Sequence, residues 1–160
     1  MKISKEFETY FSYNQIMVYD ISVTLPGCFW TEYHVKKGFA RRESTINFGT
    51  IIEFGTALIK VHNQPFKMES RFERIIAVPF YSPTGEIIIS GPEEYQTQKE
   101  IIIEIGHYRV VFAQWVINNE KEGFELYFEK IIKPQISSEI ILADEDLTPL
   151  DILLEYAEMA

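Results

Sequence analysis

Residues 101–129 read IIIEIGHYRVVFAQWVINNEKEGFELYFE, and this stretch decides the fold class. Its first and last residues alternate between apolar and polar side chains, which is the period of a half-buried β-strand. Between positions 108 and 117 the chain is apolar on both faces around Trp115, so a strand there belongs in the interior of a sheet. The polar residues 118–123 read as the loop between two strands. The stretch therefore predicts consecutive strands of a β-protein.

The same spacing recurs along the rest of the chain, with Gly, Pro, Asn and Ser between the apolar runs. Pro79 cannot donate to a strand ladder, so it marks a strand end or an edge. Ser82-Pro83-Thr84-Gly85 has the residues of a tight turn. Further strands are predicted at residues 13–20, 45–48, 56–61, 72–80 and 86–90. The predicted fold class is mainly β, an antiparallel β-sandwich of seven or eight strands.

A short internal helix is predicted between Thr31 and Gly38. Thr31 can cap the first turn, Glu32 lies at the positive end of the helix, and Lys36 and Lys37 lie at the negative end. Gly38 can adopt the left-handed conformation that ends a helix. These signals agree on a helix of barely two turns.

A second, amphipathic helix is predicted near the C-terminus. Thr148-Pro149-Leu150-Asp151 places a cap, a first-turn proline and an acid in order. An isolated helix of this length is marginal in water, so it must dock, either on its own domain or in a partner's groove. We therefore expect residues 1–133 to form the sandwich. Residues 134–160 are expected to form an acidic linker or an edge strand at 136–142, followed by this helix, within the same domain.

The acidic residues are concentrated in the second half of the sequence. The formal net charge is −9, with net +2 over residues 1–80 and net −11 over residues 81–160. An acidic surface repels phosphate backbones and attracts basic proteins. Direct nucleic-acid binding is therefore disfavoured and a basic protein partner is favoured, while solubility alone is the alternative explanation of the acidity.

The sequence carries no recognisable catalytic or metal-binding pattern. Its three histidines lack the short spacings of zinc ligands, so neither a metal nor a cofactor is expected. It contains no Gly-x-Ser-x-Gly motif and no phosphate-binding loop. An enzyme would need a deep pocket lined by Asp20, Glu53 or His107. We therefore predict that the protein is not an enzyme.

Cysteine usage and the N-terminus bear on the compartment. Cys28 is the single cysteine and is expected to be a small buried hydrophobe. Glu6 and Glu8 stand where a secretory signal has an apolar region, and no segment approaches the roughly 18 apolar residues of a membrane helix. A cytoplasmic location is predicted, with any membrane association coming through a partner.

Two rows of acidic residues form the predicted partner-contact surface. Residues two apart on a strand share a face, at roughly 6.6 Å spacing. If the strands at 100–104 and 125–129 lie in one sheet, their carboxylates form an exposed face suited to a cationic cleft, although an ordinary solvated face has the same composition. The predicted contact residues are Glu93, Glu94, Glu100, Glu104, Glu125, Tyr127 and Glu129.

Lys36, Lys37, Arg41 and Arg42 form a patch of the opposite sign. This patch can bind a polyanion, or its arginines can brace the fold and anchor a loop. The second interpretation is preferred, because surface cations so often have only local partners.

Glycine, aromatic and arginine positions at strand junctions are similar to those of a known family. The positions are Trp30, Gly38, Phe39, Arg41, Arg42, Phe48, Gly49, Pro79, Gly106 and Tyr108. Over residues 11–131 the chain resembles the competence protein J family. The resemblance implies an inhibitor of a DNA-degrading nuclease of DNA uptake. The partner would then be a basic nuclease whose DNA-binding groove the inhibitor occupies, with exposed glutamates in the place of phosphates.

Two other functions are compatible with the sequence. One is an immunity protein that neutralises a nuclease toxin. The other is a β-sandwich module that binds a small anion, a lipid headgroup or a sugar. The sequence predicts no oligomeric state.

Overall fold

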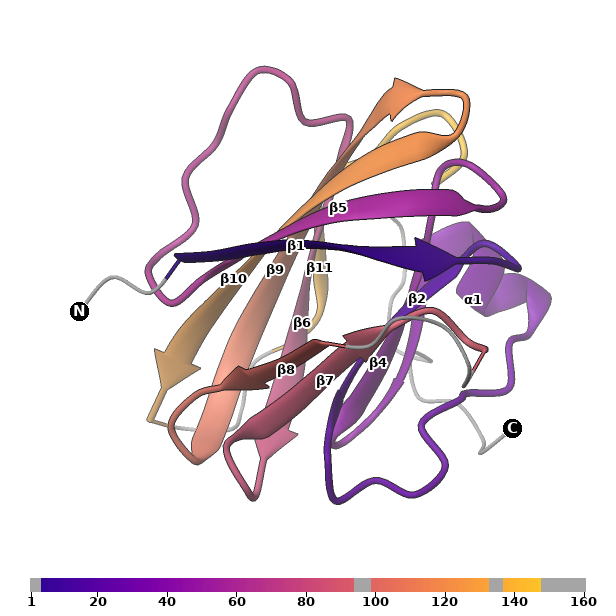
Figure 1. The fold of residues 1–160 in the computed structure, drawn as a ribbon. Helices are drawn as coiled ribbons and strands as arrows, with labels where there is room; N and C mark the ends of the chain where they lie inside the picture. The colour runs from indigo at the N-terminus through magenta and orange to yellow at the C-terminus, as the bar shows by residue number, and fades with distance from the viewer. Residues whose placement is uncertain (1–3, 94–98, 133–136, 148–160) are drawn as a thin grey trace.

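Two β-sheets packed face to face form the body of the protein in the computed structural model, which describes residues 4–93, 99–132 and 137–147 (Figure 1). One sheet has six strands and the other has five. In the described part of the chain, no helix is long and apolar enough to cross a membrane.

The six-stranded sheet contains the stretch that decides the fold class. In spatial order its strands are β1 (Ser4–Phe11), β5 (Gly55–His62), β10 (Lys121–Ile131), β9 (Gly106–Asn118), β6 (Arg74–Ser82) and β11 (Glu139–Leu142). Neighbours are antiparallel except β5 and β10, which are parallel. As its two apolar faces predict, β9 lies in the interior of the sheet, between β10 and β6.

The five-stranded sheet is antiparallel throughout. In spatial order its strands are β3 (Phe39–Arg42), β4 (Thr45–Gly49), β2 (Gln15–Asp20), β7 (Glu86–Ser90) and β8 (Lys99–Ile102).

Aromatic side chains fill the space between the sheets. Phe48 on β4 stacks on Phe112 of β9 with ring centroids 3.8 Å apart, and Phe112 stacks on Phe124 of β10 at 5.1 Å. All three are fully buried. Burying a phenylalanine contributes about 1.5–3 kcal/mol, so this stack is a main link between the two sheets.

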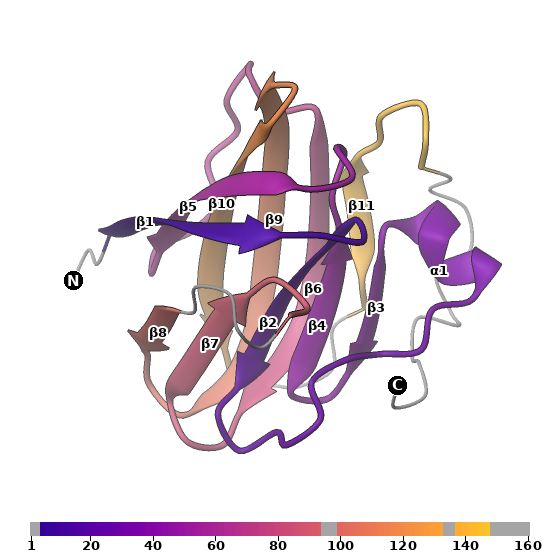
Figure 2. The same cartoon turned by 45° about the vertical axis from the view of Figure 1, so that its right-hand side comes forward.

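The predicted internal helix is confirmed as α1 (Glu32–Lys37), which lies beside β3 (Figure 2). The ring nitrogen Nδ1 of His34 accepts a hydrogen bond from the backbone N–H of Thr31 at 3.0 Å, at the start of the helix. Gly38 ends the helix with a φ of 84°. This left-handed conformation favours glycine, and a Cβ there would lie 2.9 Å from the terminal methyl groups of Ile76 and Leu147, which would have to shift.

The predicted strand count is wrong, because the described residues contain eleven strands and not seven or eight. The strands at 4–11 and 39–42 were not predicted. Strand β1 is an edge strand whose outward residues include Lys5, Glu6 and Glu8, and charges of this kind protect an edge but weaken its apolar pattern. Within the segment where a linker or an edge strand was expected, β11 pairs with the edge of β6. The predicted C-terminal helix at residues 148–160 lies outside the described residues.

Candidate functional site

The predicted acidic row on β10 is not an exposed surface. Glu125 and Tyr127 are each only 2% exposed, because the loop at residues 63–73 folds over this face of the six-stranded sheet. Phe66 of that loop packs edge-on against Tyr127, with ring centroids 5.2 Å apart. The alternation in the sequence correctly predicted which residues share this face of β10. The loop that covers the face has no periodic pattern, so its burial was not predicted.

The carboxylate of Glu125 is bonded to three other side chains of the protein. Its Oε1 accepts hydrogen bonds from Nε2 of His62 at 2.7 Å and from the hydroxyl of Tyr127 at 3.1 Å, and its Oε2 pairs with Arg71. Burial lowers the pKa of His62 and so favours the neutral form of its ring. We call Glu125, His62, Arg71 and Tyr127 the buried carboxylate cluster. Its geometry is that of a structural brace.

Glu129, the third member of the row, is also engaged. Its Oε1 pairs with Arg109 at 2.9 Å, and its Oε2 accepts a hydrogen bond from the backbone N–H of Phe66 at 2.7 Å. It thereby holds the covering loop in place.

The second acidic row lies in the other sheet, so the two rows do not combine. Glu100 is on β8 and Glu104 follows that strand, and both are exposed. Glu104 pairs with Lys130 at 2.5 Å, and that hydrogen bond lowers the pKa of its carboxyl. Of the predicted loop acids, Glu93 accepts a hydrogen bond from Ser12 at 2.7 Å, and Glu94 lies outside the described residues.

The arginines of the basic patch anchor a loop, as the preferred interpretation predicts. Arg42 donates to the carbonyl oxygens of Leu25 and Gly27, the second at 3.0 Å. Arg41 is buried and donates to the carbonyl of Pro79 at 3.4 Å. The other positions on which the family resemblance rests lie in the core or at strand ends. Phe39 and Phe48 are fully buried, and the hydroxyl of Tyr108 donates to the carbonyl of Glu104 at 2.6 Å, close to Gly106.

The residues that an enzyme would need are not brought together. Asp20 is fully buried; burial opposes its ionisation, but hydrogen bonds from Ser82, Ser22 and Thr84 together hold its pKa below the usual value. Glu53 lies in the β4–β5 loop, whereas His107 lies on strand β9. Cys28 is buried as predicted, and burial raises the pKa of its thiol. Among the described residues there is no group of three His, Cys, Asp or Glu side chains that could hold a metal.

Three connections meet at one end of the sandwich, which we call the loop end. They are the β1–β2 turn, which lies near α1 at the right of Figure 1, the β4–β5 loop, and the β9–β10 turn at the upper right. Backbone hydrogen bonds tie them together: Asn14 N–H to the carbonyl of Glu53 at 2.9 Å, Thr50 N–H to the carbonyl of Asn14 at 3.0 Å, and Thr56 N–H to the carbonyl of Glu120 at 2.9 Å. The loop end is therefore one connected surface.

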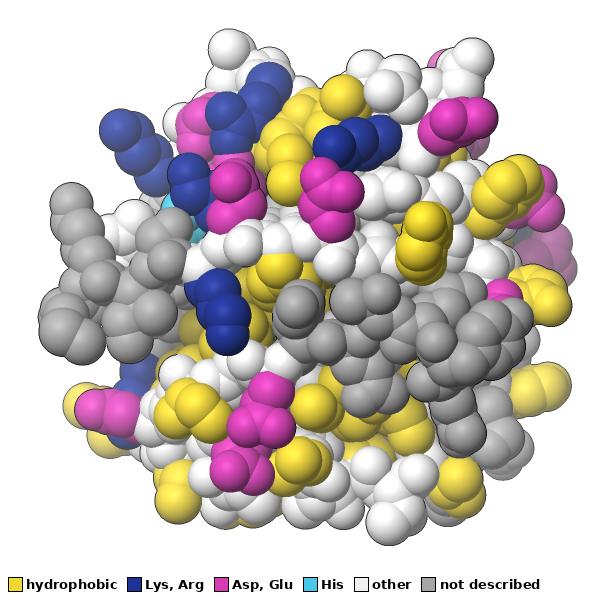
Figure 3. Space-filling view, viewed as in Figure 1, with side chains coloured by type: hydrophobic (Ala, Val, Ile, Leu, Met, Phe, Trp, Pro, Cys, Tyr) yellow, Lys and Arg dark blue, Asp and Glu magenta, His cyan; other side chains and the backbone are white. Residues whose placement is uncertain are grey.

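Exposed aromatic side chains and unpaired carboxylates lie together at the loop end. Tyr13 is 73% exposed, Phe54 is 65% exposed and Tyr10 is 58% exposed. Glu53 and Glu120 are exposed too, and neither carboxylate bonds or pairs with any residue that the structure describes. Figure 3 shows hydrophobic side chains next to acidic ones along this side of the molecule. We call Tyr10, Tyr13, Glu53, Phe54 and Glu120 the aromatic–acidic patch.

The β1–β2 turn is strained in a way that points to function. Tyr13 and Asn14 both have a φ of 55°. Asparagine tolerates this left-handed conformation, but a bulky residue such as tyrosine adopts it only at a cost. Backbone strain of this kind is concentrated at binding and catalytic sites, so this turn is a candidate binding site.

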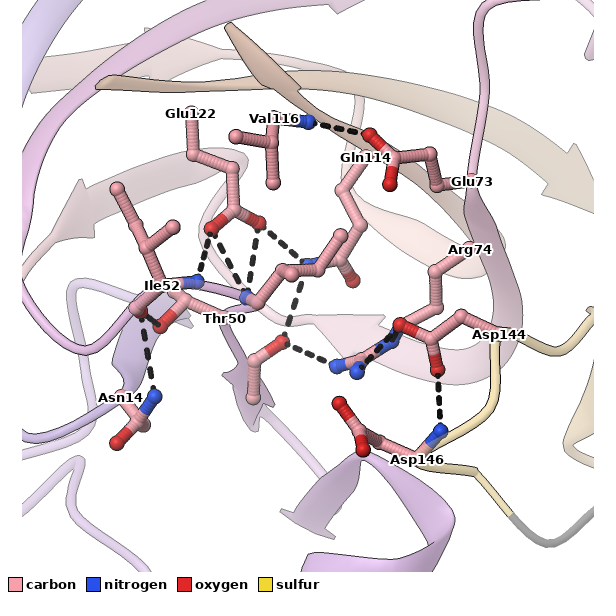
Figure 4. Close-up of polar contacts among 12 residues, drawn as sticks. Asn14, Thr50, Ile52, Glu73, Arg74, Gln114, Val116, Glu122, Asp144 and Asp146 are labelled. Carbon is pink, nitrogen blue, oxygen red and sulfur yellow. Dashed lines mark hydrogen bonds and ion pairs between the residues drawn. The ribbon is translucent and has the colours of Figure 1, made fainter. Parts of the chain in front are cut away.

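A buried carboxylate holds the β4–β5 loop from beneath (Figure 4). Glu122 is fully buried, and its Oε1 accepts hydrogen bonds from the backbone N–H groups of Ile51 and Ile52, each at 2.9 Å. Its Oε2 accepts another from Nε2 of Gln114 at 2.7 Å. Burial raises the pKa of Glu122 to about 7 in spite of these donors. The loop that carries Phe54 is thus fixed to the core of the sheet.

The hydrogen-bond network continues to the last described segment of the chain. Gln114 and Arg74 both donate to the carbonyl of Gly49, at 3.2 and 3.3 Å. Arg74 is 4% exposed and pairs with Asp144 at 2.8 Å. Residues 144–147 are therefore joined to the same rigid network as the loop end.

A groove of about 530 Å³ opens between α1, the β1–β2 turn and this segment. Its lining includes Tyr13, Trp30, Val35, Gly49, Arg74 and Asp146. The groove is also lined by three of the positions on which the family resemblance rests, Trp30, Gly38 and Gly49. Sequence reasoning missed the loop end, because it placed Tyr13 and Asn14 within the predicted strand at 13–20, whereas the structure places them in the turn before β2.

Comparisons with known proteins support one family. The family model described as competence protein J (ComJ) matches residues 8–132. A crystal structure of ComJ from Bacillus subtilis, titled as the inhibitor of the DNA-degrading activity of NucA, is similar in fold. It aligns with a TM-score of 0.72 and 20% sequence identity over 82% of this chain and 99% of its own. A structure titled crocagin biosynthetic gene J aligns with a TM-score of 0.52 and 12% identity, over 79% of this chain and 97% of its own. No curated protein sequence matches the chain significantly.

Proposed function

The chain belongs to the competence protein J family, and from that premise we propose that it inhibits a DNA-degrading nuclease by docking its aromatic–acidic patch in the nuclease's DNA-binding groove. The observation that carries the proposal is the joint exposure of Tyr13, Phe54, Glu53 and Glu120 on loops that the fold holds rigid. Glutamates supply charge in the place of phosphates, and the aromatic rings supply contact area.

The chemistry of the patch suits a basic groove. Carboxylates without an internal partner lose little on meeting a cation, because no existing ion pair has to be broken. Exposed aromatic side chains at the centre of an interface are typical binding hot spots. The acidic row on β10 cannot act in this way, since the carboxylates of Glu125 and Glu129 already have partners inside the fold.

The rigidity of the loop end supports tight binding. The backbone bonds among the three connections and the bonds from Glu122 to Ile51 and Ile52 fix the loop conformation before binding. A surface that is already ordered loses less conformational entropy on association. The net charge of −9 adds long-range attraction to a basic partner, which raises the association rate at low salt.

The proposal is tested by titrating the purified protein into the DNA-uptake nuclease of the same cell while following the cleavage of fluorescent DNA. We expect inhibition that is complete near one equivalent, is competitive with DNA and weakens as salt is raised. Full nuclease activity at a large excess of the protein would overturn the proposal. Inhibition that DNA cannot relieve would overturn the binding mode alone.

A further inference from the structure

We propose that the groove beside α1 binds an arginine side chain of the partner nuclease, and that Asp146 is the carboxylate that recognises it. The identity of the partner rests on the proposed function. The chemistry of the groove rests on its own residues, and it can be tested without any nuclease.

The groove has one uncompensated negative charge. Two charged side chains line it, Arg74 and Asp146. The guanidinium of Arg74 is already used: Nε and Nη2 donate to Oδ2 of Asp144 at 3.2 and 2.8 Å, and Nη1 donates to the carbonyl of Gly49. Its charge is therefore paired with Asp144, and each of its three nitrogens already donates a hydrogen bond.

Asp146, in contrast, has its carboxylate available. The residue is exposed, and only its backbone N–H is engaged, with Oδ1 of Asp144 at 3.2 Å. Within the described residues, no hydrogen bond or ion pair reaches its side chain. Figure 4 draws this carboxylate beside the Arg74–Asp144 pair without a bond to either. An incoming cation can therefore bind Asp146 without displacing a partner from the described part of the chain.

The walls of the groove suit a cation on an apolar stem. Val35 is 62% exposed and Trp30 is partly exposed, so both offer apolar surface to the methylene groups of a long basic side chain. The rings of Tyr13 and Trp30 attract a cation through their electron-rich faces. Arginine fits better than lysine because its planar, weakly hydrated guanidinium both stacks on rings and binds a carboxylate through two donors. A phosphate would be repelled by the carboxylate of Asp146 and would meet an Arg74 whose charge is already paired with Asp144.

Asp146 is held at the groove by its neighbours. Asp144 anchors the segment to Arg74, and Leu147 is 7% exposed and lies against Gly38 and the core. This segment follows residues 8–132, which the family model matches. The groove thus combines Trp30 and Gly49, which lie inside the matched range, with a carboxylate from outside it.

The test uses Trp30 as a reporter in the full-length Trp115→Phe variant, where it is the single tryptophan. N-acetyl-arginine amide is the probe, and N-acetyl-citrulline amide is the uncharged control of nearly the same shape. We expect a saturable change of Trp30 fluorescence in the millimolar range with the arginine probe and none with the citrulline probe. Adding Asp146→Asn weakens the binding at least fivefold, and adding Glu145→Gln, the neighbouring exposed carboxylate outside the groove lining, leaves it unchanged.

Several results would overturn the assignment. These are an equal response to both probes, no saturable response in a variant that still unfolds cooperatively, or an arginine affinity that Asp146→Asn does not change. The nuclease assay is read separately. Asp146→Asn should weaken inhibition, while Glu145→Gln should not. If the wild-type protein inhibits no nuclease but the probe binding depends on Asp146, the proposed function fails and the groove chemistry stands.

Discussion

Two regions of this protein carry glutamates beside aromatic rings and use them in opposite ways. In the buried carboxylate cluster, Glu125 and Tyr127 are covered by the 63–73 loop and bonded to His62 and Arg71. In the aromatic–acidic patch, the same residue types are exposed and the carboxylates have no partner among the residues that the structure describes. The comparison teaches that a carboxylate contributes to stability where the fold supplies its partner, and is available for binding where it does not.

The largest expected effect is the loss of stability on breaking the buried cluster. Glu125→Ala leaves His62 and Tyr127 without an acceptor in a buried site, so we expect unfolding to be easier by about 3 kcal/mol. Chemical denaturation followed by circular dichroism measures this change. Glu6→Ala, which removes an exposed strand carboxylate, serves as the control and should leave the midpoint in place. A stable Glu125→Ala variant with impaired inhibition would contradict the comparison, because Glu125 would then act in binding and not in stability.

Removing the exposed rings should affect binding and not stability. The double variant Tyr13→Ala, Phe54→Ala should weaken nuclease inhibition by about thirtyfold, because hot-spot aromatics each contribute 1 kcal/mol or more. The melting temperature should fall little, since neither ring is buried. The inhibition constant and a thermal melt of the same preparation give both readings. If binding is unchanged, these rings are not anchors.

Glu122 makes the stability of the protein depend on pH near neutrality. Burial raises its pKa to about 7, above the value of 4.5 for an exposed glutamate. The contribution of Glu122 to the free energy of unfolding is therefore fully present below pH 4.5, the pKa of an exposed glutamate as in the unfolded chain, and it is lost as the pH rises through 7. Between pH 6 and pH 8 the wild type should lose about 1.4 kcal/mol relative to Glu122→Gln.

Glu122→Gln is a suitable reference because an amide has nearly the shape of a carboxyl group and does not titrate in this pH range. Urea unfolding of both proteins at the two pH values measures the difference. Parallel behaviour of the two proteins would mean that Glu122 does not titrate in this range.

The smallest effect is expected in the strained turn, where stability and binding should move in opposite directions. Asparagine adopts a positive φ more easily than tyrosine, so Tyr13→Asn should stabilise the protein by about 0.5 kcal/mol. The same change removes an exposed ring and should weaken inhibition. A variant that loses stability would show that Tyr13 supports the fold. The aromatic–acidic patch would then contribute to stability, as the buried carboxylate cluster does.

Local patterns in the sequence predicted much of the fold. Thr31, the lysines and Gly38 were sufficient for α1, because capping and helix-ending signals act between near neighbours. The doubly apolar run around Trp115 placed β9 inside its sheet. The charged residues of β1 hid an edge strand, because an edge needs few apolar side chains.

The candidate site was harder to predict, because it depends on contacts between distant parts of the chain. Alternation correctly placed Glu125 and Tyr127 on one face, but burial of that face comes from a loop more than fifty residues earlier in the chain. The loop end, likewise, is assembled from three connections that only the topology brings together. The family resemblance named the function class without indicating either surface.

A matched pair of charge reversals tests the central claim most directly. Glu53→Lys, Glu120→Lys acts at the loop end, and Glu100→Lys, Glu104→Lys makes the same change of charge on exposed carboxylates in and beyond β8. Inhibition of the nuclease is measured for both double variants in the same buffer. We expect the loop-end pair to weaken inhibition at least tenfold and the control pair to change it little. Equal losses, or a larger loss in the control pair, would contradict the account.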